Sequence, residues 1–496
     1  MTRSNVHMSQ LFSYNCSMLD TIHNVFIVGI KGVAMANIAR ILKQMGKNVS
    51  GSDTDEEFIT DNLLITEKIP VAITFDPQSI PQDTDLVLYS AAHNGGKNPQ
   101  VQAAKERGIK IMHQAEFIGE LIKLFKTTVA VAGCHGKTTT SSLLAYALNR
   151  LGKRPSYLVG APTFEEYFGG SYDSKDLFIL EADEYGVEPP KDKTPKFLFF
   201  DPQFLIVTNI DFDHPDVYRN LDETKKSFLK FMKKMQGEQA IIACTDDSPL
   251  QEVLKEIPRE RYITYGFHKN TAVQIVNSHV ENDGMSWEIR SKIIKIPEKT
   301  KFHISLYGEK NVLNATAVVV MLSQLGHEVE KIKAAISEFH GAKRRLERLA
   351  SMGENELFDD YAHHPAEIEA TIRALKARFK DKRIVVLFQP HTFSRTAILK
   401  DKFVDALSLA DEALILPIFA SAREDSGTDG IRSIDLMHLA KKKNIHTIQG
   451  YDSNDQALID LPGFLSKKTV ICTMGAGDIY ELRDKIVKML EKSANL

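Results

Sequence analysis

A short glycine-rich segment of this chain is typical of a loop that binds phosphate groups. The sequence "VAVAGCHGKTTTSS" (129–142) runs from an apolar stretch, through a turn with two glycines, to a lysine followed by three threonines. If a helix begins at the lysine, its first backbone N–H groups attract an anion. The lysine would reach the terminal phosphates of a nucleotide, and the hydroxyl of Thr138 or Thr139 would bind Mg²⁺. The candidate phosphate-binding residues are Gly133, Cys134, His135, Gly136, Lys137, Thr138 and Thr139.

The spacing of this loop departs from the standard nucleotide-binding pattern. That pattern places four residues between its first glycine and Gly-Lys-Ser/Thr, and counting back from Gly136 puts Val131 where the first glycine would stand. A glycine-rich turn with a lysine also occurs as a plain connection between a strand and a helix. The run Gly-Lys-Thr-Thr after an apolar strand favours the phosphate site over that simpler interpretation.

Acidic residues follow two further apolar runs, in "LEADEYG" (180–186) and "TNIDFDHPDVY" (208–218). In open α/β sheets ligands bind beyond the carboxyl ends of the strands, so we expect these groups to converge on the phosphate loop. Carboxylate oxygens with one imidazole suit Mg²⁺ or Mn²⁺, although acidic loop residues are also common as solvated surface. The groups are Glu181, Asp183, Glu184, Asp211, Asp213, His214 and Asp216.

The N-terminal part carries a second, weaker glycine motif. "GIKGVAM" (29–35) follows an apolar run, but its spacing is GxxGxxM instead of the GxGxxG of dinucleotide-binding loops. Asp53, at the end of the next apolar run, is placed to meet a ribose hydroxyl. A site for NAD and a site for a nucleotide diphosphate both remain open on this pattern. The candidate residues here are Gly29, Gly32, Ser52 and Asp53.

Apolar runs of strand length alternate with helical patterns along most of the chain, which predicts an α/β fold with doubly wound parallel sheets. These elements must position the loops described above, because each candidate loop follows an apolar run. Residues 270–306 alternate between apolar and polar side chains and predict an antiparallel insertion. Boundaries are expected near 120–128 and near 339–349.

Length and composition are those of an ordinary globular protein. A chain of 496 residues suggests about three domains at roughly 150 residues each. The net charge of −3 gives no indication of nucleic-acid or membrane binding, and no apolar run is long enough to span a bilayer. The four cysteines lack the spacing of a zinc site or a disulfide framework, which favours reduced thiols in the cytoplasm.

Taken together, the motifs of this chain resemble those of the Mur ligases of peptidoglycan synthesis, in order and in approximate separation. The matching segments are "GCHGKTTTS", "EADE", "TNIDFDHPD", "YGEKNVLNA", "GAKRRLE", "DDYAHHP", "FQPHTFSRT" and "MGAGDI". The resemblance implies a three-domain architecture. A flexible tail (1–23) would precede a Rossmann-like domain for a UDP-sugar (24–125), a central P-loop ATPase domain (126–342) and a Rossmann-like C-terminal domain for an amino acid (343–496). The unusual spacing of the phosphate loop is also a family trait.

Within the family, "DDYAHHP", "LFQPHTFSRT" and "MGAGDI" are most similar to members that join L-alanine to UDP-N-acetylmuramate. The resemblance therefore implies ATP and Mg²⁺ (or Mn²⁺) as cofactors, UDP-N-acetylmuramate and L-alanine as substrates, and a monomer or homodimer. An alternative is the recycling ligase that attaches a ready-made tripeptide, which "EADEYG" and "TPKF" resemble. A nucleotide-dependent switch without ligase activity is an alternative of another class, and an NAD oxidoreductase is less favoured.

The resemblance also implies roles for individual residues. Lys137, Glu181 and His214 would be catalytic, and Thr138, Glu181 and His214 would hold the metal. Asn311, Arg345 and Asp360 would contact ATP. The amino-acid end of the site would be formed by Tyr361, His363, His364, His391 and Arg395, with the arginine pairing with the alanine carboxylate.

Two residues depart from the family pattern. Lys31 stands where the family commonly has glycine, and it would crowd the UDP loop or add a contact to the diphosphate. Thr392 replaces an arginine often found after the histidine of "PHTFSRT", which puts substrate contacts at that position in doubt.

Overall fold

The computed structural model describes residues 18–297, 299–420, 430–465 and 468–494. The proposed tail therefore lies mostly outside the described residues. Its last part differs from the expectation, because Met18–Asp20 form a short 3-10 helix (η1) and Leu19 and Ile22 are buried in the hydrophobic core. The apolar side chains of residues 18–23 bind this segment to the N-terminal domain.

The N-terminal domain is built on a five-stranded sheet with the order β3-β2-β1-β4-β5, and all neighbouring strands are parallel. Its strands are β1 (Asn24–Val28), β2 (Asn48–Ser52), β3 (Val71–Ala72), β4 (Leu86–Tyr89) and β5 (Lys110–His113). Its helices are α1 (Val33–Gln44), α2 (Asp61–Thr66), α3 (Pro99–Glu106) and α4 (Gln114–Ile122). Short 3-10 turns are η2 (Pro77–Ser79) and η3 (Gly95–Lys97).

The middle domain contains a ten-stranded sheet with the order β17-β16-β15-β14-β13-β12-β6-β9-β7-β8. Its strands are β6 (Thr127–Ala132), β7 (Ser156–Phe164), β8 (Tyr167–Ser171), β9 (Leu177–Ala182), β12 (Phe204–Val207), β13 (Ile241–Cys244), β14 (Tyr262–Gly266), β15 (Val273–Glu281), β16 (Gly284–Ser291) and β17 (Lys301–Ile304). The antiparallel pairing of β15, β16 and β17 confirms the insertion predicted for 270–306.

Helices and a separate hairpin complete the middle domain. The helices are α5 (Lys137–Arg150), α6 (Leu221–Lys233), α7 (Ser248–Leu254), α8 (Glu309–Gln324) and α9 (Val329–Ser337), with 3-10 turns η4 (Lys196–Phe199) and η5 (Arg259–Arg261). The antiparallel hairpin consists of β10 (Gly186–Glu188) and β11 (Asp192–Pro195).

The C-terminal domain has a six-stranded sheet with the order β18-β19-β23-β20-β21-β22, in which only the edge strand β18 is antiparallel to its neighbour. Its strands are β18 (Glu347–Met352), β19 (Asn355–Asp360), β20 (Arg383–Phe388), β21 (Glu412–Ile415), β22 (Ile448–Gly450) and β23 (Thr469–Met474). Its helices are α10 (Pro365–Arg378), α11 (Phe393–Leu407), α12 (Ser433–Lys442), α13 (Asn454–Asp460) and α14 (Arg483–Ala494), with η6 (Leu461–Phe464) and η7 (Asp478–Leu482).

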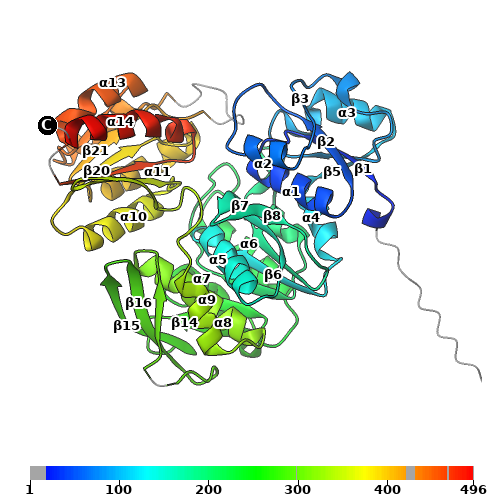
Figure 1. The fold of residues 1–496 in the computed structure, drawn as a ribbon, viewed down its shortest axis with the longest axis horizontal. Coiled ribbons are helices and arrows are strands. Elements are labelled where there is room, and N and C mark those ends of the chain that lie inside the picture. Colours follow the sequence, from blue (N-terminus) through cyan, green and yellow to red (C-terminus); the bar gives the residue numbers. More distant parts are fainter. Residues whose placement is uncertain (1–17, 298, 421–429, 466–467, 495–496) are drawn as a thin grey trace, which may run out of the picture.

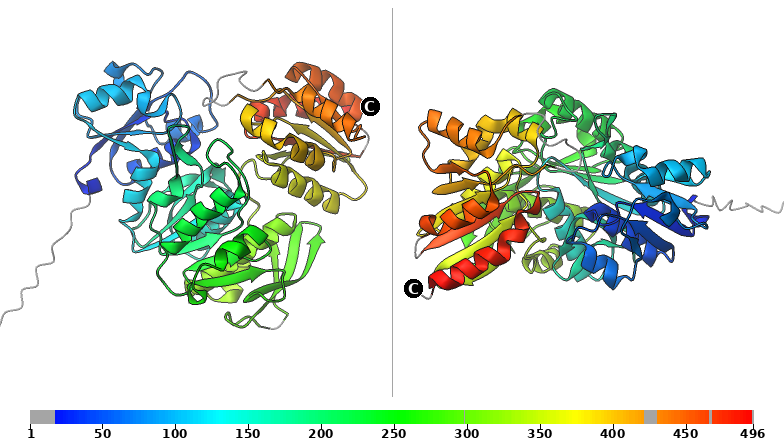
Figure 2. Two further views of the ribbon diagram at one scale, coloured as in Figure 1. Left: turned by 180° about the vertical axis from the view of Figure 1, so that it is seen from behind. Right: turned by 90° about the horizontal axis from the view of Figure 1, so that it is seen from above.

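Burial on both faces explains why the central strands are mainly apolar. Every residue of β23 is buried, and separate apolar clusters cover the two faces of the C-terminal sheet. By contrast, one apolar cluster runs continuously through the N-terminal and middle domains. The parallel α/β sheets predicted from the alternating pattern are confirmed, as Figures 1 and 2 show for the three parts of the chain.

The strand order of the middle sheet positions the site. The neighbours β12, β6 and β9 are parallel, so their carboxyl ends lie at one edge of the sheet. The phosphate loop follows β6, and the two acidic segments follow β9 and β12. Segments separated by up to about 80 residues in the sequence are thereby brought together, as expected for an open α/β sheet.

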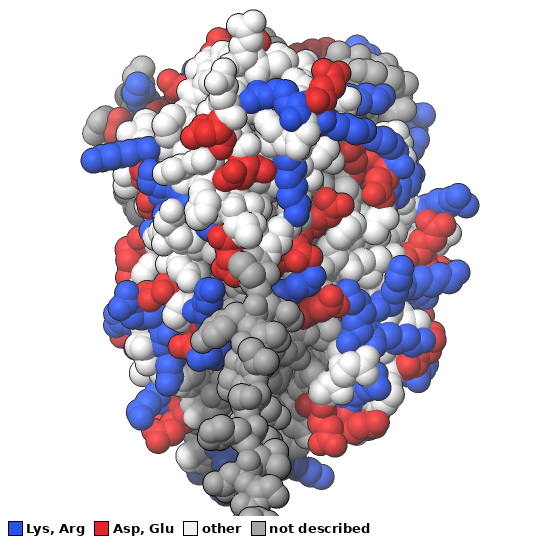
Figure 3. Space-filling view, turned by 90° about the vertical axis from the view of Figure 1, so that its right-hand side faces the viewer, with Lys and Arg blue, Asp and Glu red and all other residues white. Residues whose placement is uncertain are grey.

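The outer surface agrees with the small net charge. In the face shown in Figure 3, basic and acidic side chains are interspersed and neither sign forms a large continuous patch. Among the described residues, no helix combines the length and the apolar character needed to cross a membrane.

Candidate active site

The loop between β6 and α5 can be formed only with glycine at two positions. Gly133 has a φ of 138° and Gly136 a φ of 81°, which L side chains rarely adopt. A Cβ atom on Gly133 would lie 2.0 Å from Thr208 Oγ1, and one on Gly136 would lie 2.6 Å from Asn314 Oδ1. Glycine therefore permits both the backbone conformation and the close packing of this loop against its neighbours.

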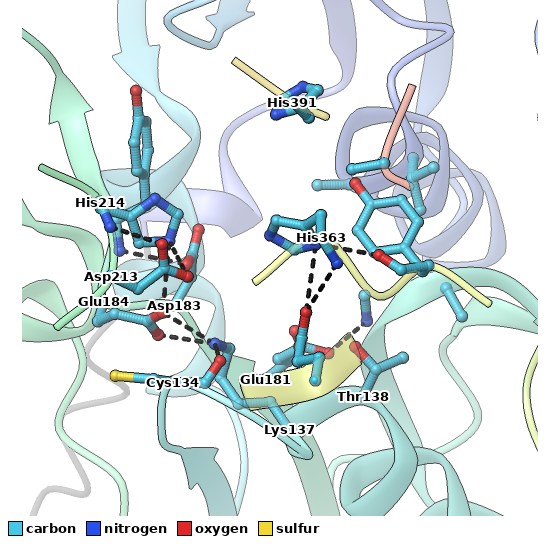
Figure 4. A pocket seen from close by; sticks show the side chains of 18 of the residues that line it. Cys134, Lys137, Thr138, Glu181, Asp183, Glu184, Asp213, His214, His363 and His391 are labelled. Atoms are coloured by element: carbon cyan, nitrogen blue, oxygen red, sulfur yellow. Dashed lines mark hydrogen bonds and ion pairs between the residues drawn. The ribbon is translucent and has the colours of Figure 1, made fainter. Parts of the chain in front are cut away.

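Lys137 extends from the first turn of α5 back over the loop. Its Nζ donates to the carbonyl oxygen of Gly133 at 2.7 Å and lies 2.7 and 3.0 Å from the two carboxylate oxygens of Glu184. Burial alone would lower the pKa of Lys137, but the carboxylates of Glu184, Asp183 and Glu181 outweigh it and raise the pKa. The ammonium group is thus a permanent positive charge at the bottom of the site (Figure 4).

A triad of potential metal ligands lies beside this lysine. One ligand atom each from Asp183, Glu184 and His214 lies within 4.8 Å of the others, and His214 Nε2 is 3.5 Å from Glu184 Oε1. Asp183 is paired with Lys196 at 2.8 Å. Burial alone would raise the pKa of Asp183, but Lys196, Lys137 and His214 lower it, so this carboxylate is ionised.

Glu181 lines the same cavity as His214 but is not part of this triad. Its Oε2 accepts the backbone N–H of Gly160 at 2.9 Å, and burial raises its pKa above the ordinary value. Thr138 is next to it and accepts a hydrogen bond from Arg345 at 3.1 Å. The sequence predicted Thr138, Glu181 and His214 as one metal set, whereas the structure groups His214 with Asp183 and Glu184.

The donor set of the structure fits a hard divalent cation. Two carboxylates and one imidazole are suitable for Mg²⁺ or Mn²⁺, and Asp183 and Glu184 have cationic partners in Lys196 and Lys137. The negative charges of Asp183 and Glu184 are thus balanced by the ammonium groups of Lys196 and Lys137. A bound divalent cation would balance part of the same negative charge.

Two cavities meet at the phosphate loop. The first, of about 460 Å³, brings together Lys137, Glu181 and His214 with residues of the C-terminal domain. The second, of about 630 Å³, lies between α8 and α10. The predicted ATP contacts that line the second cavity are His135, Gly136, Thr139, Asn311, Arg345 and Asp360. Both cavities share Gly136, Arg345 and Glu367 in their walls, so they are adjacent at these residues.

Four of the five residues predicted for the amino-acid end line the first cavity: Tyr361, His363, His391 and Arg395. His364 does not line it. Its Nδ1 accepts the N–H of Ala366 at the start of α10, and its Nε2 is 3.3 Å from the carbonyl oxygen of Phe212. His364 therefore caps a helix and contacts the middle domain.

Arg395 is engaged by the protein itself. Its guanidinium lies 2.9 Å from Asp213 and 3.2 Å from His214 Nδ1, and the side chains of both Arg395 and Asp213 are almost fully buried. We expected Arg395 to pair with the alanine carboxylate, but in this structure it pairs with a carboxylate of the middle domain. The contact links α11 to the loop after β12.

The residues predicted for the UDP-sugar do not line the first cavity themselves, although Val33 and Ala34, which follow Gly32 directly, do. Asp53 is fully buried and accepts the N–H groups of Lys31 and Thr54 at 2.7 and 2.8 Å, while Ser52 donates to Gln100. The loop that starts at Gly29 is therefore organised by the Asp53 carboxylate. None of the four residues predicted for the UDP-sugar lines the first cavity: Gly29, Gly32, Ser52 and Asp53.

The departure at Lys31 has a structural explanation. Its Nζ donates to the carbonyl oxygen of Glu56 at 2.7 Å and lies 3.6 Å from Asp61. The ammonium group of Lys31 therefore contacts the segment that follows β2 and the first residue of α2, which lie 25 and 30 residues further along the chain than Lys31.

Glu367 was missed by the sequence analysis. It lines both cavities and lies 3.3 Å from His135 of the phosphate loop. A signal for it was present, because Glu367 follows His364-Pro365 at the third position of α10, where an acidic residue closes a capping box.

Comparison with known families agrees with this arrangement. The model described as "Mur ligase family, catalytic domain" matches residues 24–126, "Mur ligase middle domain" matches 131–322, and "Mur ligase, glutamate ligase domain" matches 344–477. A curated relative from Lactobacillus acidophilus, named UDP-N-acetylmuramate--L-alanine ligase, is 35% identical over 474 residues, which cover 95% of this chain and 100% of the relative.

Solved structures share the fold. The crystal structure of UDP-N-acetylmuramate-alanine ligase from Thermotoga maritima is similar with a TM-score of 0.74 at 24% identity, over 95% of this chain and 99% of the other. A murein peptide ligase from Psychrobacter arcticus gives a TM-score of 0.71 at 22% identity, with the same coverage of both chains. The three-domain architecture implied by the motifs is confirmed. The chain belongs to the Mur ligase family.

Proposed function

We propose that this protein joins L-alanine to UDP-N-acetylmuramate at the expense of ATP. The observation that carries the proposal is the meeting of the two cavities at the phosphate loop. A nucleotide in the larger cavity would direct its terminal phosphate past Gly136 to Lys137, which lies in the wall of the smaller cavity. Curated relatives at 33–36% identity carry the name of the L-alanine ligase, which favours this substrate over a tripeptide.

The reaction proceeds in two transfers. A carboxylate oxygen of the sugar acid attacks the γ-phosphorus of ATP, ADP leaves, and an acyl phosphate forms. The neutral amine of alanine then attacks the acyl carbon, and the tetrahedral intermediate loses a proton from nitrogen to solvent and expels phosphate to give the amide. Two anions must approach each other in the first step, so fixed positive charge from Lys137 and Arg345 lowers its barrier.

A divalent cation would bind at Asp183, Glu184 and His214, where it would withdraw negative charge from the phosphates. We expect His214→Ala to raise the Mg²⁺ concentration needed for half-maximal activity by about tenfold to a hundredfold, because one ligand is lost. Mn²⁺ binding followed by electron paramagnetic resonance measures the same change without turnover. His268→Ala is the matched control, since His268 is exposed and pairs only with Asp246 among the contacts described. An unchanged metal requirement would contradict the assignment.

The substrate assay is designed to separate the alternatives. Purified protein with ATP, Mg²⁺ and UDP-N-acetylmuramate is expected to release phosphate only after L-alanine is added. Parallel reactions with glycine, L-serine and the tripeptide test the amine. Phosphate release at the same rate with and without an amine would instead favour the nucleotide-dependent switch. Release only in the reaction that contains the tripeptide would favour the recycling ligase.

Asp360 provides a pH-dependent prediction for ATP binding. Burial raises the pKa of this carboxyl to about 6, even though Thr371 donates a hydrogen bond to it. The group is therefore ionised at pH 7.5 and accepts a ribose hydroxyl, but it becomes protonated as the pH falls below about 6. We expect the KM for ATP to rise by up to about tenfold per pH unit below that point. In Asp360→Asn this pH dependence should disappear, and its persistence would argue against the ribose contact.

The cysteines bear on the location of the protein. Cys134, Cys244 and Cys472 are buried as free thiols. We propose a cytoplasmic location, because thiols stay reduced in that compartment.

A further inference from the structure

Glu367 occupies the boundary between the two halves of the site. It is the third residue of α10 in the C-terminal domain, and its side chain is only 14% exposed. It lines the cavity that holds the nucleotide contacts as well as the cavity that holds the catalytic groups. A carboxylate in this position touches parts of both substrate sites.

One arm of Glu367 reaches the phosphate loop. Its Oε1 lies 3.3 Å from Nδ1 of His135, whose Nε2 lies 3.0 Å from Asp211. Burial alone would lower the pKa of His135, but Asp211 and Glu367 raise it to about 9. His135 is therefore an imidazolium at neutral pH, held between a carboxylate of the middle domain and one of the C-terminal domain.

The backbone of His135 is also fixed. Its N–H donates to Asn209 Oδ1 at 2.9 Å, and its carbonyl oxygen accepts from Thr208 and Asn209. The backbone of His135 is thus fixed within the phosphate loop, and Glu367 contacts the imidazolium directly.

The other arm of Glu367 holds the loop that precedes α10. Its Oε2 accepts the backbone N–H of His363 at 3.1 Å and of His364 at 3.2 Å, and it lies 3.5 Å from Nδ1 of His363. His363 lines the smaller cavity, on the side proposed for the amine. Burial lowers the pKa of His363 to about 4, so this imidazole is neutral.

We propose that Glu367 is a positioning residue. By contacting His135 and the backbone of His363 and His364, it fixes the phosphate loop relative to the loop before α10 (the His363 loop), and so fixes the nucleotide side of the site relative to the amine side. The proposal rests on the ligase function given above and adds a residue to it. Capping of α10 alone would need only an acceptor for two backbone N–H groups. The contact with His135 adds a requirement for negative charge.

This difference makes Glu367→Gln the decisive variant. The glutamine carbonyl oxygen can still cap α10, but the charge that holds His135 is lost. We expect kcat to fall by about tenfold, because the buried ion pair that holds His135 is lost, while the melting temperature stays close to that of the wild type. Because the amide oxygen still accepts the N–H groups of His363 and His364, we expect the KM for L-alanine to stay close to that of the wild type. A wild-type kcat would reduce Glu367 to a helix cap and overturn the proposal.

The chain offers a close control. Helix α4 begins with the same arrangement, in which His113 is the N-cap and Glu116 closes the capping box. Glu116 is exposed and lines neither cavity. Glu116→Gln is therefore expected to keep wild-type kcat and KM, which separates the charge requirement at Glu367 from a general effect on capping boxes.

A double-mutant cycle with His135→Asn tests the connection itself. If Glu367 acts through His135, the double variant is expected to have a kcat no lower than that of the worse single variant, whereas independent roles would multiply the two losses. His135→Asn also decides the matter if Glu367→Gln does not fold, because wild-type kcat in that variant would overturn the proposal. Absence of alanine-dependent phosphate release in the wild type would instead refute the proposed function.

Discussion

The Lys137→Ala variant is expected to lose ligase turnover by about a thousandfold. Lys137 is a buried, permanently charged group in the wall of the first cavity, directly after Gly136, which both cavities share. In such a water-poor site one fixed donor contributes about 3–4 kcal/mol to the transition state. The loss should appear in kcat measured by phosphate release, while binding of UDP-N-acetylmuramate measured by calorimetry should persist.

The variant also leaves Glu184 buried without its main cation, so folding has to be tested separately. The double variant Lys137→Ala with Glu184→Gln removes that unpaired charge. It is expected to recover any lost melting temperature but no turnover. Lys126→Ala is the surface control, because Lys126 is exposed and pairs with the exposed Asp176. Turnover near that of the wild type in Lys137→Ala would refute the assignment of the phosphate loop.

The Arg344→Ala variant is expected to destabilise the C-terminal domain by about 3 kcal/mol. The guanidinium of Arg344 is buried, lies 3.3 Å from Asp359 and donates to the carbonyl oxygens of Gly475 and Gly477. Removal leaves these buried acceptors without that donor, although Arg483 remains 3.2 Å from Asp359. Denaturant titration with a probe in the C-terminal domain measures the change in the free energy of unfolding.

A surface arginine shows how specific this effect is. Arg219 is 87% exposed and pairs with Glu223, four residues further along the chain in the first turn of α6. Arg219→Ala is expected to change stability little, because exposed ion pairs are screened by water and salt. If Arg344→Ala is as stable as this control, the buried network around Asp359 does not stabilise the domain.

Local features were predictable because short-range rules govern them. The turn with Gly133 and Gly136 needs positive φ angles and close backbone packing, and both requirements are visible as glycines before Lys137. The alternation of apolar runs with helical patterns indicated parallel α/β sheets, because strands covered on both faces are apolar throughout. The convergence of the segments after β9 and β12 on the phosphate loop followed from the general rule for strand ends.

Contacts between distant side chains were not predictable in the same way. The sequence placed Glu181 and His214 in one metal set, which stays a prediction, and it did not indicate that His214 would approach Asp183 and Glu184, which follow the strand that contains Glu181. The contact of Arg395 with a substrate carboxylate stays a prediction, but its ion pair with Asp213, which depends on the packing of α11, was not visible in the sequence. Spacing along the chain specifies the end of a strand, but it does not specify which charges meet there.

Residue types, local spacing and periodicity were therefore sufficient for the class of the fold and for the nucleotide loop. The pairing of charges across the domains depended on how the domains pack. Glu367 illustrates this, because its capping position could be read from "HHPAE", but its contact with His135 joins segments more than 200 residues apart. Such a contact forms only when two separately folded sheets approach each other, and no local rule encodes that approach.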